Sequence, residues 1–123
     1  MYTISDIAKL LGITAHTLRY YEKEGIIAPI RNPSGERVYD DSNLAWLRFM
    51  MRLKQTQMPI SQIKEYAHLY LEGEHTTQAR LNLLEDHRNA VQSQIRNLTA
   101  TEKVLKDKIA AYKNSITKET GVR

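Results

Sequence analysis

The sequence contains no cysteine and little glycine or proline, with five Gly and three Pro among 123 residues. Without a thiol, this chain on its own cannot bind a metal through thiolate, form a disulfide, or sense oxidants through cysteine. No stretch approaches the roughly 18 apolar residues of a membrane span, and no apolar signal region follows the N-terminus. We therefore expect a cytoplasmic protein with one compact domain and an extension, and no membrane partner.

Residues typical of enzymes are also scarce. The four histidines stand at positions 16, 68, 75 and 87, and there is no nucleophile elbow and no glycine-rich phosphate loop. His68, Glu72 and His75 are spaced so that they could meet around a helix end. Solvated polar residues at a bend are favoured over a metal site there by about ten to one. We expect no enzymatic activity, no bound metal and no cofactor.

The N-terminal segment predicts two short helices joined by a tight turn. Ser5 is the expected N-cap of the first helix, whose apolar stripe is Ile4, Ile7, Ala8 and Leu11. Gly12 can take the left-handed conformation that ends a helix, and Thr14 can cap the next one, which should stop at Gly25. Two helices joined so tightly must cross steeply, as in a helix-turn-helix.

The second helix has a polar, basic free face. Four side chains share this face at helical spacing, namely His16, Arg19, Tyr20 and Lys23. Leu18 and Tyr21 point the other way, toward the core. A guanidinium can bind phosphate or guanine edges, and the net charge of +4 suits a polyanionic partner. Taken alone, the segment also fits a generic helical hairpin with a solvated face.

A short hairpin follows the second helix. Two β-like runs flank the turn signal Pro33-Ser34-Gly35 and carry Arg31, Arg37 and Tyr39. Such a hairpin beside a basic helix is typical of a wing that reaches backbone phosphates. A plain surface hairpin would leave the two arginines and the aromatic residue unexplained.

A second pair of helices is predicted in the middle of the chain. Asp40 or Asp41 should cap a helix that runs to about Gln55, and Ser61, after Pro59, should cap another that lasts until Gly73. In the first helix, Trp46 and Phe49 are expected in the core, and the apolar surface comes from Leu44, Leu47, Met50, Met51 and Leu53. The expected buried face of the second helix is Ile63, Tyr66, Ala67 and Tyr70.

The C-terminal region predicts one long helix. No Gly or Pro occurs between residues 74 and 120, so about 40 residues, on the order of 60 Å, should be helical. A heptad repeat places Leu84, Val91, Leu98, Leu105 and Tyr112 at one position and Leu81, Ile95, Ile109 and Ile116 at its companion, which Arg88 and Glu102 interrupt. A domain of roughly 70 residues cannot bury such a helix, so its apolar seam requires a partner.

These motifs, in the order in which they occur along the chain, resemble those of the MerR (mercury-resistance-regulator) family of bacterial transcription factors. The resemblance runs from Tyr2 to about Tyr70 and rests on the segments 17–22, 25–27, 37–39 and 44–49. It implies a mainly α fold, in which residues 1–73 form a winged helix-turn-helix DNA-binding domain with a second helix pair. Residues 74–123 would form the dimerisation helix, paired with a second chain as an antiparallel coiled coil.

The resemblance also implies contact residues. Thr17, Arg19 and Tyr20 would bind DNA from the recognition helix, and Arg37 and Tyr39 from the wing. Gln57 stands where the family usually has glycine. The C-terminal half is similar to a small subgroup that responds to aldehyde and thiol stress, but the cysteine usual near positions 54 and 55 is missing, so the signal stays open.

The expected function is that of a homodimeric, sequence-specific transcriptional regulator on a pseudo-palindromic operator. Family activators distort promoters with an over-long spacer so that RNA polymerase, a further implied partner, can engage both promoter elements. No large drug-binding C-terminal domain is expected. The alternative is an architectural or adaptor DNA-binding protein without direct transcriptional control.

Overall fold

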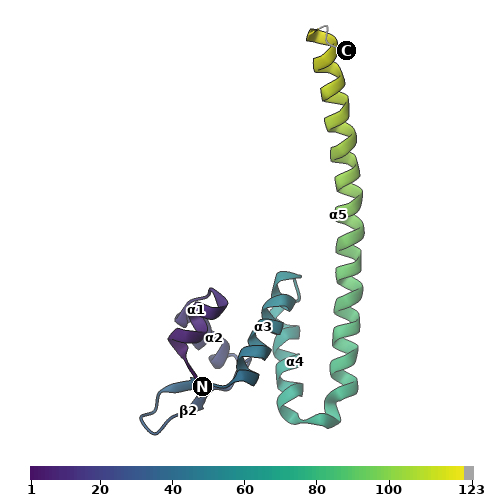
Figure 1. Ribbon diagram of the computed structural model, residues 1–123. Coiled ribbons are helices and arrows are strands. Elements are labelled where there is room, and N and C mark those ends of the chain that lie inside the picture. Colours follow the sequence, from purple (N-terminus) through teal and green to yellow (C-terminus); the bar gives the residue numbers. More distant parts are fainter. Residues whose placement is uncertain (121–123) are drawn as a thin grey trace. The chain divides into compact units, whose positions relative to one another are not determined.

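The computed structural model describes residues 1–120 and is mainly helical, as predicted (Figure 1). Its elements are β1 (Tyr2–Thr3), α1 (Ile4–Leu11), α2 (Ala15–Lys23), β2 (Ile30–Arg31), β3 (Arg37–Tyr39), α3 (Asp41–Gln55), α4 (Ile60–Glu72), the 3-10 turn η1 (Glu74–Thr76) and α5 (Thr77–Thr120). Residues 1–84 form one compact unit, and a second begins at residue 85. The first unit thus includes the first two turns of α5.

Helix α1 begins earlier than predicted. Its N-cap is Thr3, whose Oγ1 accepts a hydrogen bond from the Asp6 backbone N–H at 3.0 Å. Asp6 reciprocates by accepting from the Thr3 N–H at 3.0 Å, and these bonds from Thr3 hold the pKa of the Asp6 carboxyl below its usual range. The prediction of Ser5 as the cap is therefore wrong. Strand β1 pairs with β3 and already holds Thr3 in the extended conformation that an N-cap needs.

The tight turn between α1 and α2 is confirmed. Gly12 has φ 67°, in the left-handed region, and Thr14 caps α2 by accepting from the Thr17 N–H at 3.1 Å. Gly25, just beyond the end of α2, has φ 74°. A Cβ at Gly25 would lie 2.7 Å from Nε2 of the exposed His68 side chain, which can turn away, so it is the backbone conformation that favours glycine there.

The predicted hairpin is confirmed as part of a three-stranded antiparallel sheet with strand order β1-β3-β2. Asn32 fixes its turn, because Oδ1 accepts from the N–H groups of Ser34 at 3.0 Å and Glu36 at 2.9 Å. Gly35 takes φ 80°. Strand β1, two residues long, was not predicted from the sequence.

The second helix pair is confirmed, with one change in capping. Asp40 caps α3, accepting from the Asn43 N–H at 2.8 Å. Pro59 occupies the N-cap position of α4 and supplies no side-chain bond, so the prediction that Ser61 caps α4 is wrong. Between the two helices, Gln57 has φ 69°, a conformation that costs a non-glycine residue about 1 kcal/mol.

The core lies within residues 1–84. Its buried hydrophobic side chains are Ile7, Leu18, Tyr21, Ile26, Ile27, Tyr39, Leu44, Leu47, Met50, Leu53, Met58, Ile63 and Ala67. Phe49 and Tyr70 are 39% and 55% exposed, which contradicts the prediction that they are core residues. Trp46 packs against the core, donates from Nε1 to the Ile26 carbonyl at 2.7 Å and stacks on Tyr66 at 5.5 Å between ring centroids.

The predicted long helix is confirmed, because α5 has 44 residues and is therefore about 66 Å long. Its heptad-repeat side chains are largely exposed, among them Leu98 at 70% and Leu105 at 57%. Leu84 differs from the others, because it packs against the core of its own unit.

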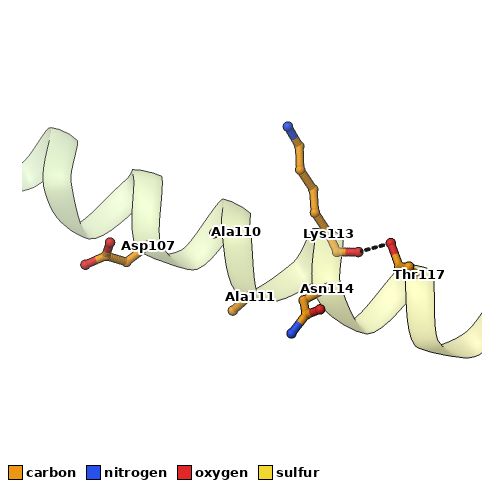
Figure 2. A pocket seen from close by; sticks show the side chains of 6 residues that line it. All are labelled: Asp107, Ala110, Ala111, Lys113, Asn114 and Thr117. Atoms are coloured by element: carbon orange, nitrogen blue, oxygen red, sulfur yellow. Dashed lines mark hydrogen bonds between the residues drawn. The ribbon is translucent and has the colours of Figure 1, made fainter. Parts of the chain in front are cut away.

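Polar and small side chains lie on α5 away from the heptad seam, near its C-terminal end. Figure 2 shows a depression lined by Asp107, Ala110, Ala111, Lys113, Asn114 and Thr117, all from this one helix. Lys113 points away from Asp107 and Asn114, and Thr117 donates a hydrogen bond to the Lys113 carbonyl at 2.9 Å. Since a single helix forms every wall, the depression cannot enclose a ligand.

Candidate DNA interface

The exposed face of α2 is the first part of the candidate interface. His16, Arg19 and Lys23 are exposed, and Tyr20 is 44% exposed. Leu18 and Tyr21, on the opposite face, are buried at 0% and 2% exposure. The orientation predicted from the helical spacing is therefore confirmed. Whether these four side chains contact DNA stays a prediction.

Thr17 has a partly structural role. It lies in the first turn of α2, is half-buried, and shares a hydrogen bond of 2.9 Å between its hydroxyl and that of Thr14. Its backbone N–H is also the donor to the capping Thr14 oxygen. A contact from this hydroxyl to a phosphate would therefore extend an existing hydrogen-bonded pair.

Four ion or hydrogen-bonded pairs hold α2 and its C-cap residue, Glu24, against neighbouring elements. Glu24 accepts from Lys64 of α4 at 2.8 Å, which lowers the pKa of the Glu24 carboxyl and raises that of the Lys64 amine. Lys54 of α3 donates to the Tyr21 hydroxyl at 3.1 Å. Glu22 binds the wing. Helix α2 is thus fixed to four other elements of the same unit, namely α3, α4, β2 and β3.

The wing carries its two arginines on facing positions. Arg31 of β2 is paired with Arg37 of β3 in the antiparallel register. Glu22 of α2 binds both, with Oε1 2.9 Å from an Arg31 terminal nitrogen and Oε2 2.7 Å from Arg37 Nε. The hydrogen bond to Glu22 raises the pKa of the Arg37 guanidinium. The structure therefore brings Arg31 and Arg37 beside α2, as the wing hypothesis required.

Tyr39 is a correction to the predicted site. Its side chain is fully buried at 0% exposure, and its hydroxyl has no hydrogen-bonding partner among residues 1–120. Burial raises the pKa of this hydroxyl, and the Glu22 carboxylate raises it further. The prediction that Tyr39 contacts DNA is wrong for this conformation. Strand β3 directs Arg37 and Tyr39 to the same face, and that face meets the core at position 39.

Glu22 was missed as a functional residue. Its sequence signal was a local conflict, because a carboxylate in the last turn of a helix opposes the helix dipole. A negative charge is also unexpected beside a surface that binds phosphates. Such a conflict indicates a compensating partner, which the structure identifies as the two wing arginines.

Other possible sites gain no support from the geometry. His75 lies 3.7 Å from Glu72, and His68 lies against Gly25, so the three side chains do not form one cluster. In residues 1–120 no group of three or more His, Cys, Asp or Glu side chains is placed to hold a metal ion. Nor does any helix in this range have the length and apolar character of a membrane span.

The fold and site define a winged helix-turn-helix protein, and comparison with known proteins identifies its family. The MerR HTH regulatory protein family matches residues 2–69, and the MerR DNA-binding family matches residues 44–108. An HTH-type transcriptional regulator of Haemophilus influenzae is 36% identical over 93% of this chain and 85% of its own length. The chain belongs to the MerR family of transcriptional regulators.

Similar solved structures agree with this assignment. HiNmlR, a MerR family regulator lacking the sensor domain and bound to promoter DNA, is 35% identical with a TM-score of 0.86, covering 98% of this chain and 95% of that one. A MerR family protein from Listeria monocytogenes is 30% identical with a TM-score of 0.91, over 98% and 92% of the two chains. These similarities confirm the predicted fold.

A further relative is the regulator AdhR of Bacillus subtilis. It is 42% identical over 86 residues, which are 69% of this chain. The match spans 61% of AdhR. The relatives are transcriptional regulators, in agreement with the function predicted from the sequence.

Proposed function

We propose that this chain acts as a cytoplasmic homodimer that binds a pseudo-palindromic promoter operator and has no catalytic activity. The observation that carries the proposal is the exposed basic face of α2 beside a wing with two arginines, on one compact unit. Its likeness to HiNmlR, which was solved on promoter DNA without a sensor domain, supports the same mode of binding.

The recognition helix supplies sequence discrimination in this proposal. Arg19 lies in the middle of α2, and its planar guanidinium can bind a guanine edge or a phosphate with two hydrogen bonds. Tyr20, His16 and Lys23 are exposed beside it and can reach the backbone on either side. Arg31 and Arg37 then bind phosphates from the wing, next to the groove that α2 enters.

The dimer is formed by α5. Its seam contains the half-buried Val91 and Leu84, which also packs on the core, and the exposed residues Leu81, Ile95, Leu98, Leu105, Ile109 and Tyr112. In an antiparallel pair, facing residue numbers have a constant sum, and we choose 193 because it faces Ile95 with Leu98. The two polar interruptions, Arg88 and Glu102, then lie in adjacent layers and can pair across the dimer.

A two-fold dimer places one recognition helix in each of two half-sites, which predicts a pseudo-palindromic operator. We further propose that the bound dimer distorts a promoter with a long spacer so that RNA polymerase engages both promoter elements. The signal that controls this step does not act through a thiol of this chain, because the sequence has no cysteine.

The test is selection of bound fragments from genomic DNA by the purified protein, followed by transcription in vitro. We expect one pseudo-palindromic site inside an over-long promoter spacer, and a change in transcript level when protein is added. Removing the extra base pairs from the spacer should abolish that change while leaving binding intact. Selected sites outside promoters, with no effect on transcription, would contradict the proposal and favour an architectural role.

A further inference from the structure

The wing of this protein contains an arrangement that is unfavourable on its own. Arg31 and Arg37 occupy facing positions on β2 and β3, and like charges directly opposite each other destabilise a strand pair. The hairpin is also short, with two residues in β2 and three in β3. A hairpin of this size is marginal unless another element holds it.

Glu22 compensates for this arrangement from a different element. One carboxylate oxygen lies 2.9 Å from Arg31 and the other 2.7 Å from Arg37 Nε, so the group bridges both strands to α2. Arg31 also donates to the Gly35 carbonyl at 3.2 Å, which ties the bridge to the hairpin turn. The Glu22 side chain is 22% exposed, and Arg37 is 26% exposed. The Glu22–Arg37 pair is therefore screened less than an ion pair in open solvent, whereas Arg31 is 48% exposed and its pair with Glu22 is screened more.

The position of Glu22 is costly for a DNA-binding surface. A carboxylate beside the proposed phosphate contacts repels the nucleic acid and cancels part of the arginine charge. Charge alone would thus favour a neutral residue at position 22. Each guanidinium has five N–H donors, so both arginines keep donors for phosphate while Glu22 holds them.

We propose that Glu22 is a positioning residue that fixes the wing arginines relative to the recognition helix. Because the arginines are held in place, they reach phosphates only when α2 lies in the major groove of the operator sequence. Glu22 therefore increases discrimination between the operator and other DNA. This inference rests on the proposed function of α2 and the wing as the DNA interface. Its measurable consequence is a change in the ratio between the affinity for the operator and the affinity for other DNA.

The experiment compares Glu22→Gln and Glu22→Asp with wild type on two duplexes, the one selected by the wild-type protein and a shuffled duplex of equal length. Glu22→Gln removes the charge, and Glu22→Asp keeps it but is too short to bridge both arginines. The matched control is Glu36→Gln, which removes the same charge from an exposed side chain next to Arg37, in the turn of the wing. Affinities are measured over a range of salt concentrations.

We expect the ratio of operator to shuffled affinity to fall about 10-fold in both Glu22 variants, the size of one well-placed contact, and to change less than about 2-fold in Glu36→Gln. Glu22→Gln should also bind the shuffled duplex more tightly and with a steeper salt slope. Stronger binding of both duplexes by the same factor in Glu22→Gln, with Glu22→Asp equal to wild type, would overturn the proposal.

A double-mutant cycle distinguishes a positioning role of Glu22 from a role in stability alone. In a variant with Arg31→Ala and Arg37→Ala, adding Glu22→Gln should leave the affinity ratio unchanged, because the groups that Glu22 holds are gone. An equal fall in the ratio with and without the arginines would overturn the proposal. A wild-type protein that selects no sequence would contradict the proposed function itself, which is a distinct outcome.

Discussion

The two compact units of this chain bury their apolar residues in different ways. All thirteen buried hydrophobic side chains lie between Ile7 and Ala67, and none of the described residues after Leu84 contributes another. In the second unit, Ile95, Leu98 and Ile109 are each more than half exposed. The first unit therefore has a core of its own, while the seam of α5 is a surface that only a second chain can cover.

The largest expected effect comes from a charge placed in that seam. Leu98→Asp should weaken dimerisation by about 10,000-fold, because each of two symmetric layers loses about 3 kcal/mol of apolar packing. Sedimentation equilibrium measures the dissociation constant. Ala111→Asp, at a position outside the seam, shown in Figure 2, should leave it within about 2-fold of wild type, which makes it the matched control. Equal effects of both substitutions would remove the contrast between the two units.

The register of the dimer sharpens the comparison further. With facing residue numbers that sum to 193, Arg88 of one chain lies near Glu102 of the other, twice by symmetry. Arg88→Leu and Glu102→Leu should each destabilise the dimer more than the double substitution does, with a coupling of about 0.5 to 3 kcal/mol. Denaturation at several protein concentrations measures it. Simple additivity would exclude this register, although an antiparallel dimer with another sum would remain.

Within the first unit, the capping of α1 gives a smaller effect. Thr3→Ala should lower the free energy of unfolding by about 1 kcal/mol, because it removes the oxygen that accepts from the Asp6 N–H. Ser5→Ala should change it by less than about 0.5 kcal/mol. Urea denaturation of both variants provides the measurement. A larger loss of unfolding free energy for Ser5→Ala than for Thr3→Ala would support Ser5 as the N-cap, as predicted from the sequence.

The smallest effect is expected at Tyr39. Since its hydroxyl is buried and unpaired within residues 1–120, Tyr39→Phe should leave the stability unchanged or raise it by up to about 1 kcal/mol. Operator affinity should stay within about 2-fold of wild type. The two measurements are thermal unfolding and a binding titration. Weaker binding by a folded Tyr39→Phe dimer would show that the side chain leaves the core to contact DNA.

These cases show which features could be predicted from the sequence. The helix-turn-helix, the hairpin and α5 follow from local signals, such as Gly12, Gly35 and the heptad repeat, and all three are confirmed. The choice of Thr3 over Ser5 depends on strand β1 pairing with β3, a contact between residues far apart in sequence. A two- or three-residue strand does not reveal which face meets the core, so Tyr39 was misassigned.

Among the side chains of the candidate interface, too, some placements could be predicted from local spacing and others could not. The helical spacing was sufficient to place Arg19 and Tyr20 on the free face and Leu18 and Tyr21 in the core. The bridge from Glu22 to Arg31 and Arg37 could not be read from spacing, because the three residues come from three elements. Only the unfavourable position of Glu22 in its own helix indicated a partner.

The central claim is that α2 reads the operator, and Arg19→Ala tests it most directly. The variant should lose about 1 to 3 kcal/mol of affinity for the selected duplex, measured by titration of a folded dimer. Lys103→Ala, on α5, is the control and should bind like wild type. A loss confined to the selected sequence indicates a base contact, and a uniform loss with a shallower salt slope indicates a phosphate contact. Unchanged operator affinity in a folded Arg19→Ala dimer would contradict the account.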